Sequence, residues 1–466
     1  MNTWWTRRVQ CAVIAATLFA ADIAIAKNPF ILASGRRDPR IYAIDLKAAL
    51  KPENNNTPNA IVSRSLVSPR RLDGVLLGDP ANVVLSQDQK SAYVMNHHGS
   101  VVNAEFLQHG GRANVTIMDV KKMLDRKFDD TDAAVLKIVD AGWFGGTGLI
   151  ALPDVIIASA SEGWLTVDGS NRISFIDPRT GGLVGQIELP LTGPGTRQMN
   201  SSCANFPVPF VSPTPPPTTQ AFLTPNPAWG CWPNPQFMAL GKGSDGKIYL
   251  VSGNGGTEDV SVMDLQKALA GVKVVEVAPR IPVQAGPFGI AASPNGKFVA
   301  ITSRQSSKTG VGGNTISIID VDLARQGLPG AEAARVQIGS DRANEQARPF
   351  WVAWTPDGKE ILTGNAGTNN VSIIDLALAL AHKPGAEVAR IPLTRPDGAP
   401  ARPKVVAVTA DGQYAAVTGG DDTGSKSSTN PTGMVYVIDI PNRKVVAQVT
   451  NVGIEPYGVT IVDDAD

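Results

Sequence analysis

Alternating apolar and polar residues recur along the chain in short segments that end in a hydrophobic pair and an aspartate. The segment Asn370-Val-Ser-Ile-Ile-Asp375 is a clear example. Such alternation over a few residues is typical of a half-buried β-strand. Seven segments share the pattern, and they end at Asp45, Asp119, Asp177, Asp264, Asp320, Asp375 and Asp439. The chain therefore repeats one structural unit seven times, and the spacing of 55 to 87 residues indicates loops of unequal length.

The rest of the unit lies upstream of each aspartate. A proline leads a short apolar strand, which ends in a tight turn such as Pro356-Asp-Gly358. Asp-Gly and Asn-Gly supply the positive φ that tight hairpin turns require. A second strand follows, as in 360–364, then the aspartate-ending strand and a fourth strand such as 444–449. Four strands in about 63 residues are typical of one blade of a β-propeller.

The two ends of the chain together supply one unit. Residues 30–34, 40–45 and 61–66 read as three strands, but no proline-led strand precedes them. The C-terminal stretch 455–462 has the missing pattern. We therefore predict an all-β fold, a seven-bladed β-propeller that fills residues 27–466 and closes by pairing N- and C-terminal strands in one blade. Closure removes sheet edges that would otherwise pair between molecules.

Residues 1–26 have the features of a signal peptide. Arg7 and Arg8 precede the apolar run 11–21, and Ala24-Ile-Ala26 is a typical cleavage site. We expect a periplasmic or secreted protein exported by the Sec route, with twin-arginine export as the alternative. No later apolar stretch is long enough for a membrane helix, so no transmembrane segment is expected.

The repeat resembles a known family. Ala92-Tyr-Val-Met-Asn96 and Asn370-Val-Ser-Ile-Ile-Asp375 are similar to the YVTN-type repeat of bacterial surface-layer propellers, which is related to lactonase-type propellers. The resemblance covers nearly all of the chain after the signal segment. It implies the seven-bladed fold, and through the lactonase-type relatives it also implies a possible hydrolytic activity. A fold alone does not specify a function.

Composition and cysteine content narrow the picture further. With 42 basic and 42 acidic residues the net charge is zero, which excludes a typical nucleic-acid binder. Besides Cys11 the chain has only Cys203 and Cys231, and both lie in the proline-rich insertion 190–235. In an oxidising compartment they are expected to form one disulfide, with two separate thiols as the alternative.

Three of the four histidines fall in one insertion, at His97, His98 and His109. Imidazole is the commonest metal ligand and suits Zn or Cu. A glycine-bounded loop can bring one of the adjacent pair toward His109. The alternative is that all three are ordinary loop side chains.

Further candidates lie in loops that propeller topology places on one face. The acidic ones are Glu258, Asp259, Asp421 and Asp422, which suit Ca²⁺ binding or acid–base work. The aromatic ones, Trp229 and Trp232, flank Cys231. The basic ones are Arg304, Arg348 and Arg402, which suit an anion. Each has a plain structural alternative, as a solvated charge or as loop packing.

Two functions remain open. The first is an exported binding protein that uses the loop-rich face to hold a small ligand or a protein partner, since no common catalytic motif is present. The second is a metal-assisted enzyme of lactonase, hydrolase or lyase type with its site at the channel mouth. The sequence leaves the substrate, the partner and the oligomeric state open.

Overall fold

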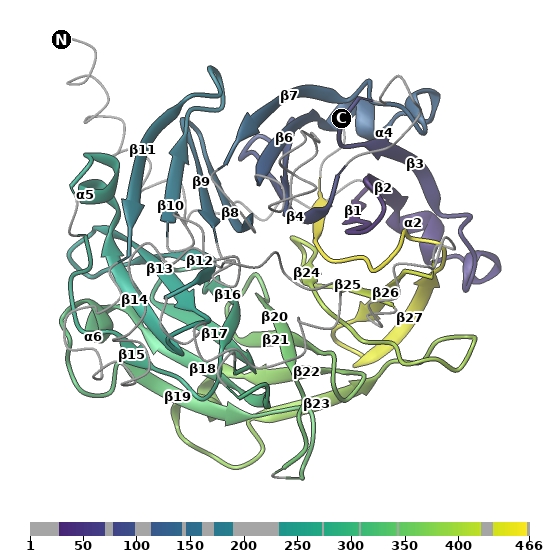
Figure 1. The fold of residues 1–466 in the computed structure, drawn as a ribbon. Coiled ribbons are helices and arrows are strands. Elements are labelled where there is room, and N and C mark those ends of the chain that lie inside the picture. Colours follow the sequence, from purple (N-terminus) through teal and green to yellow (C-terminus); the bar gives the residue numbers. More distant parts are fainter. Residues whose placement is uncertain are drawn as a thin grey trace.

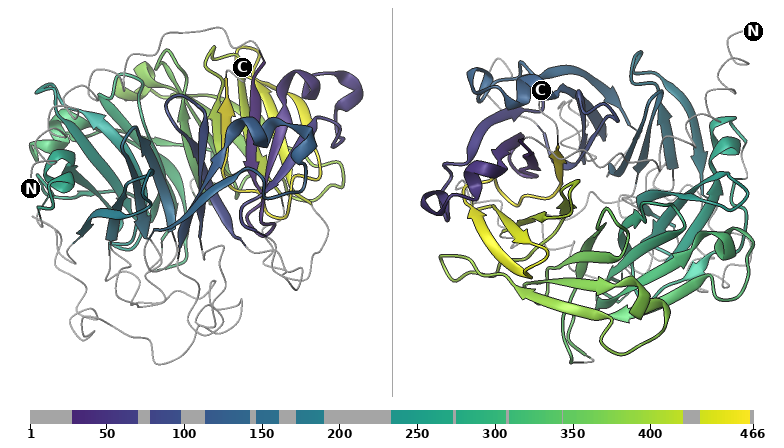
Figure 2. Two further views of the ribbon diagram at one scale, coloured as in Figure 1. Left: turned by 90° about the horizontal axis from the view of Figure 1, so that it is seen from above. Right: turned by 180° about the vertical axis from the view of Figure 1, so that it is seen from behind.

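The computed structural model describes residues 28–69, 78–97, 113–141, 146–160, 172–189, 233–272, 275–306, 309–342, 344–420 and 432–463. The strands in these ranges form seven antiparallel sheets of four strands each. The sheets stand around a central axis as the blades of a propeller (Figures 1 and 2). The seven-bladed β-propeller predicted from the repeat is confirmed.

Each blade runs from an innermost first strand to an outermost fourth strand. Blade 1 is built from β28 (Val459–Val462), β1 (Phe30–Ser34), β2 (Arg40–Asp45) and β3 (Ile61–Leu66). Blade 2 contains β4 (Pro80–Leu85), β5 (Ser91–Asn96), β6 (Asn114–Asp119) and β7 (Val135–Asp140). Blade 3 contains β8 (Gly146–Leu152), β9 (Val155–Ala160), β10 (Arg172–Ile176) and β11 (Leu183–Glu188).

The remaining blades follow in chain order. Blade 4 contains β12 (Pro235–Lys242), β13 (Ile248–Asn254), β14 (Asp259–Asp264) and β15 (Ile281–Pro282). Blade 5 contains β16 (Pro287–Ala292), β17 (Phe298–Gln305), β18 (Gly312–Asp320) and β19 (Glu332–Gln337). Blade 6 contains β20 (Pro349–Trp354), β21 (Glu360–Asn365), β22 (Asn370–Asp375) and β23 (Glu387–Pro392). Blade 7 contains β24 (Val406–Val408), β25 (Tyr414–Gly419), β26 (Met434–Asp439) and β27 (Lys444–Val449).

Blade 1 closes the ring in the predicted way. The C-terminal strand β28 pairs antiparallel with β1, with Thr460 opposite Leu32 and Val459 opposite Ala33. Just beyond the ladder, the amide of Ser34 donates to the carbonyl of Gly458 at 2.8 Å. The first and last described segments of the chain are therefore joined by backbone hydrogen bonds.

The aspartates of the repeat cap short helices and turns, as their position predicts. Asp119 accepts a hydrogen bond from the amide of Lys122 and begins α4 (Val120–Leu124). The same arrangement begins α2 (Leu46–Ala49), α5 (Leu265–Leu269), α6 (Val321–Arg325) and α7 (Leu376–Leu380). These aspartates satisfy amides that a helix start leaves unpaired, so their role is structural.

The first strands of neighbouring blades approach each other very closely. A Cβ added to Gly289 in β16 would lie 2.4 Å from the carbonyl oxygen of Phe350 in β20. Gly148 and Gly458 occupy the same position in blades 3 and 1, and a Cβ there would also strike the next blade. At this register the absence of a side chain lets adjacent blades touch.

Buried hydroxyl groups add a hydrogen bond at the same junctions. Thr418 of blade 7 donates to the carbonyl of Tyr457 in the next blade at 2.7 Å, and Ser159 of blade 3 donates to that of Gln236 at 2.8 Å. Each bond satisfies a carbonyl that the bulged start of a first strand leaves outside the ladder.

Of the helices in the described part of the chain, none has the length and hydrophobicity that crossing a bilayer requires. The expected signal peptide at 1–26, and Cys203 and Cys231 with their disulfide, lie outside the described residues and stay predictions.

Substituting Gly289→Ala tests the close approach of the first strands. The new methyl group would press on the backbone of β20, so we expect a loss of roughly 3 kcal/mol in the free energy of unfolding, the upper end of the usual cost of overpacking. The control is Gly185→Ala in β11, where the added Cβ would lie 3.6 Å from Phe175, an ordinary contact. Urea unfolding measures both; equal stability of the two variants would contradict this account.

Candidate functional site at the mouth of the channel

The propeller has one face on which the first strands begin and the second strands end, called here the mouth face. The connections 98–112, 161–171 and 421–431 each join a second to a third strand, and 190–232 joins blade 3 to blade 4. Both ends of each connection therefore lie on the mouth face. The candidates His98, His109, Asp421, Asp422, Trp229 and Trp232 fall in these connections, outside the described residues.

Aromatic rings fill the inner ends of the first strands at this face. Phe237, Phe288, Phe350, Trp351 and Tyr457, here called the aromatic floor, follow the proline that leads each of their strands. Neighbouring rings meet edge to face with centroids 4.5 to 5.0 Å apart. Apart from the half-buried Trp351 the rings are almost fully buried. The floor is thus a packed layer inside the ring of first strands.

Arg304 lies on this floor. Its guanidinium carbon is 4.7 Å from the ring centre of Phe288 and 4.5 Å from that of Phe350. The residue stands near the end of β17 and is half-buried. Cations are attracted to aromatic faces, more strongly where water is partly excluded. The stacking fixes the orientation of a positive group at the mouth.

A second group of charges surrounds Glu455, whose side chain is only 2% exposed. Its carboxylate is 3.3 Å from the Nζ of Lys404, which is fully buried, and 2.7 Å from the Nε of Arg37. Arg36 lies 3.5 Å from Glu455 and bridges to Asp79 of blade 2 at the same distance. A buried carboxylate needs such partners because desolvation is costly.

Tyr457 connects the two charge groups. Arg36 and Lys404 lie 4.6 and 5.0 Å from the centre of its ring, and Phe350 packs against it at 4.6 Å. Phe350 in turn carries Arg304. One continuous layer of rings and cations, here called the charge layer, therefore runs from blade 5 to blade 1. It contains Arg304, Phe288, Phe350, Tyr457, Lys404 and Arg36.

Arg348 and Arg402 begin the first strands of blades 6 and 7. Arg348 precedes Pro349 and donates from its Nη2 to the side chain of Gln346 at 3.0 Å. Arg402 precedes Pro403, and its backbone amide donates to the Oδ1 of Asn369 at 2.9 Å. Both side chains are half-buried. With Arg304 they put an arginine on the mouth face in three consecutive blades.

The two described carboxylates predicted for the site have different surroundings. Asp259 is buried and accepts hydrogen bonds from Asn254 and Thr257, both at 2.7 Å. Burial raises the pKa of its carboxyl group, against the opposing charge of Arg280. Glu258 has a left-handed backbone with a φ of 61°, and its carbonyl accepts from the amide of Val283. Asp259 thus stabilises a turn inside blade 4.

His97 joins blades 2 and 3. Its side chain is buried, and its Nδ1 lies 3.0 Å from the carbonyl oxygen of Gly146, the first residue of β8. Such a bond fixes a tautomer in which Nδ1 carries the proton, so Nε2 is the atom suited to a metal. Among the residues that the structure describes, no group of three or more His, Cys, Asp and Glu side chains could hold a metal ion. The metal hypothesis for His97, His98 and His109 stays a prediction.

Sequence reasoning missed much of this layer. Lys404, Glu455 and the aromatic floor were not predicted, although each lies within two residues of the proline that leads a first strand. Aligning those prolines would have shown that the following residue is Phe288, Phe350 or Tyr457 in three blades and Lys404 in a fourth. The signal was present in the repeat itself.

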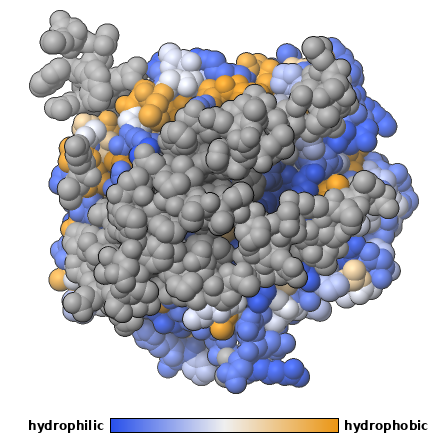
Figure 3. Space-filling model, in the orientation of Figure 1, coloured by the Kyte–Doolittle hydropathy of each residue, from blue (hydrophilic) through white to orange (hydrophobic). Residues whose placement is uncertain are grey.

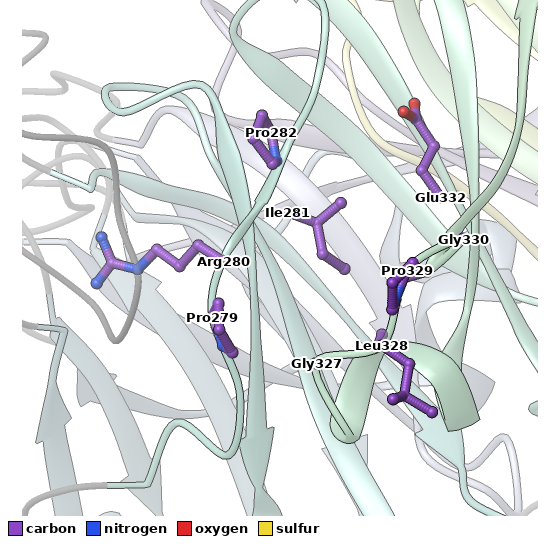
Figure 4. A pocket seen from close by; sticks show the side chains of 11 residues that line it. Pro279, Arg280, Ile281, Pro282, Gly327, Leu328, Pro329, Gly330 and Glu332 are labelled. Carbon is purple, nitrogen blue, oxygen red and sulfur yellow. The ribbon is translucent and has the colours of Figure 1, made fainter.

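A hollow of about 520 Å³ lies away from the mouth, at the outer rim of blades 4 and 5 (Figure 4). Pro279, Ile281 and Pro282 line one side, and the turn after α6, with Leu328, lines the other. Blade 4 has three residues between Glu276 and Arg280, one more than blade 6 has between Glu387 and Arg390, and its fourth strand β15 has only two residues. The Arg280 side chain points away from the hollow and pairs with Glu276 at 2.7 Å.

The described surface is largely hydrophilic around the rim, and apolar surface gathers along the upper edge in Figure 3, over β7 and β11. The most exposed large apolar side chains there are Leu136 and Leu183, at 54% and 58%. They lie on outer strands, far along each blade from the charge layer at the mouth.

Residues 217–400 match the sequence model of a family described as "Lactonase, 7-bladed beta-propeller". The match spans blades 4 to 6, from β12 to β23. The resemblance of the repeat to the YVTN-type repeat stays a prediction. No curated protein sequence matches the chain.

Solved structures share the fold at low identity. The periplasmic gluconolactonase of Pseudomonas aeruginosa aligns with a TM-score of 0.54 and 14% identity, over 93% of this chain and 99% of that one. A putative 6-phosphogluconolactonase of Bacteroides uniformis aligns with the same values. Hydrazine synthase of Kuenenia stuttgartiensis gives 0.51 and 17%, over 82% and 90%. At such identities the likeness shows the fold alone.

Substituting Asp259→Asn tests whether this carboxylate is structural. In blade 6 the same position is Asn370, which accepts from Asn365 at 2.7 Å, so asparagine fits the turn. We expect the free energy of unfolding at pH 7 to be unchanged or higher, since both hydrogen bonds can persist and the neutral amide avoids the cost of a buried charge.

The pH dependence provides the sharper readout. Because the carboxyl pKa is raised in the folded state, wild-type stability falls as pH rises from the unfolded pKa through the folded one. In thermal unfolding scans at low and at neutral pH, the stability of Asp259→Asn should not show this decrease. A matching decrease in the variant would contradict the assignment.

Proposed function

We propose that the protein hydrolyses a lactone at the mouth of the propeller channel. The single observation that carries the proposal is Arg304, whose guanidinium lies over the rings of Phe288 and Phe350 where the first strands begin. The lactonase-family match over residues 217–400 and the gluconolactonase fold neighbour support the same reaction class.

Lactone hydrolysis requires a positive group that is positioned before the reaction begins. Water adds to the lactone carbonyl carbon, and the carbonyl oxygen becomes an oxyanion. The ring C–O bond then breaks, a proton passes to the released ring oxygen, and an open hydroxy acid forms. A fixed cation in a partly water-excluded site stabilises such an oxyanion without reorganising. Arg304 is half-buried at the mouth face and is held by the rings of Phe288 and Phe350.

The charged groups around Tyr457 contribute the rest of the electrostatic potential at the mouth face. Lys404 and Arg36 stand beside its ring, and Glu455 neutralises part of their charge. A partly balanced cluster keeps its cations fixed in place. In this proposal it shapes the potential at the mouth while Arg304 faces the reacting oxygen.

A metal ion is an additional part of the hypothesis. His97 is the described member of the histidine set, and its Nε2 is the atom that would bind the ion, since Nδ1 faces Gly146. A metal there would polarise the carbonyl. Metal analysis of the purified mature protein tests this part: stoichiometric Zn or Cu, lost in His97→Ala, would support it, and metal-free active protein would contradict it.

Binding without turnover is a second candidate. The observation that favours it is that the described acid–base groups at the mouth bond to the protein itself. Asp259 caps a turn, Glu455 pairs with cations, and the Nδ1 of His97 faces a backbone carbonyl. A ligand-holding propeller needs only the cations and the floor.

Arg304→Ala decides between the two candidates. With δ-gluconolactone as substrate and acid release as the measurement, we expect a 10²- to 10³-fold lower kcat/KM, the usual cost of losing one oxyanion-stabilising group. Arg304→Lys keeps the charge but loses the planar guanidinium group, so its kcat/KM should fall between those of wild type and Arg304→Ala.

The matched control is Arg335→Ala in the outer strand β19 of the same blade, where the arginine pairs with Glu332 and lies 40% exposed. It should leave the rate unchanged. Wild-type protein that opens δ-gluconolactone no faster than buffer would contradict the proposed enzyme and favour binding alone.

A further inference from the structure

Asparagine is followed by glycine at two places in the chain, Asn254 and Asn295. Such a dipeptide deamidates readily, because glycine has no side chain that would shield its backbone nitrogen from the asparagine amide. The two places have different surroundings. Asn295 is exposed in the turn between β16 and β17, on the face opposite the mouth, whereas Asn254 is fully buried at the end of β13.

The amide oxygen of Asn295 accepts two hydrogen bonds. The Oγ of Ser293 donates to its Oδ1 at 2.8 Å, and the backbone amide of Lys297 donates to the same atom at 3.0 Å. Nucleophilic addition to the amide carbon places negative charge on this oxygen, and donors already in position stabilise such an oxyanion. The folded turn therefore favours the first step of deamidation.

The attacking nitrogen lies at the exposed tip of a hairpin. The amide of Gly296 donates to the carbonyl of Ser293 at 2.8 Å, so this bond must open before the nitrogen can react. Bonds at exposed tips open far more often than those inside a sheet. Asn254, in contrast, donates from its Nδ2 to Asp259 and Ser261, both at 2.7 Å within blade 4. Its reaction requires the blade itself to open.

The same turn carries an aspartate in four other blades, at Asp88, Asp245, Asp357 and Asp411. In blade 6 the Oδ1 of Asp357 accepts from the Oγ1 of Thr355 at 2.7 Å and from the amide of Lys359 at 3.1 Å. The glycine that follows has a φ of 70° in blade 6 and 73° in blade 5. The geometry of the turn in blade 5 is thus one that accommodates an aspartate.

The turn also favours the charged form of that aspartate. Hydrogen bonds from the side chain of Ser86 and from the amide of Lys90 lower the pKa of the Asp88 carboxyl group. A carboxyl group whose pKa is lower in the folded state stabilises the fold above its unfolded pKa, and this stabilisation is lost as pH falls through the folded pKa. At neutral pH the turn should therefore hold an aspartate at least as well as an asparagine.

We propose that Asn295 is a site of spontaneous deamidation and that the folded protein accepts the aspartate that results. The backbone nitrogen of Gly296 forms a bond to the side-chain carbon of Asn295, the bond from that carbon to the amide nitrogen breaks, and ammonia leaves. Water then opens the cyclic imide and leaves a carboxylate. The isoaspartate that the same ring can give adds a carbon atom to the main chain, which the hydrogen-bonded turn does not fit. Water is the only co-reactant.

The test follows the purified mature protein during incubation at mildly alkaline pH in heavy-oxygen water, with mass spectrometry of its peptides. We expect incorporation at Asn295 to be roughly tenfold or more faster than at Asn254, since the buried site reacts only after its blade opens. Equal rates at the two sites, or no incorporation at Asn295, would overturn the assignment.

Asp357→Asn is the matched variant, because it places the same dipeptide in the same turn of blade 6. It should deamidate at a rate similar to that of Asn295 and thereby regenerate the wild-type aspartate. A variant that stays unmodified while Asn295 reacts would show that the turn does not promote the reaction.

Asn295→Asp tests whether the fold accepts the product. Its Tm at neutral pH should equal or exceed that of wild type, and any gain should disappear in acid, where the carboxyl group is protonated. A clearly lower Tm at neutral pH, or failure of the variant to fold, would contradict the second half of the proposal. The measurements are independent of lactone hydrolysis, since the turn lies on the opposite face from the mouth.

Discussion

The pairing of β28 with β1 holds together the ring and the mouth at once. β28 provides the first strand of blade 1, and it packs between β24 and β4, the first strands on either side. Glu455 and Tyr457 belong to the same C-terminal segment, and their partners Arg36 and Arg37 follow β1. The part of the layer around Glu455 and Tyr457 therefore depends on the closed ring.

Closure of the ring also brings the first strands so close together that some positions have room only for glycine. Gly289 allows β16 to touch β20, and the rings of Phe237 from blade 4 and Trp351 from blade 6 meet with centroids 4.5 Å apart. A packed interior allows few alternative arrangements of its side chains. A cation that lies on such a layer is held by the layer itself. Among the residues that the structure describes, the rings of Phe288 and Phe350 are the contacts of the Arg304 guanidinium.

The period of the sequence pattern predicted what depends on local alternation: the strands, the capping aspartates and the closing strand. It could not predict contacts between distant blades. Phe237 and Trp351 are more than a hundred residues apart, and their rings meet because blades 4 and 6 approach each other at the axis. The extra residue before Arg280 shortens β15 in a way that no alternation pattern signals. Predicting the site from residue type named Arg304, which lies on the described layer, but it missed the rings of the aromatic floor, Lys404 and Glu455.

The mouth is chemically uneven, and the unevenness follows from the repeat. The residue after the leading proline faces the neighbouring first strands and is free of ladder pairing, so each blade can differ there. It is aromatic in blades 5, 6 and 1, lysine in blade 7, glutamine in blade 4 and alanine in blade 2, and Thr147 has the same place in blade 3, where Gly146 replaces the proline. The aromatic rings and the lysine at this position therefore fall in four consecutive blades, 5, 6, 7 and 1. A seven-fold repeat of the backbone thereby gives a mouth face whose chemistry differs around the axis.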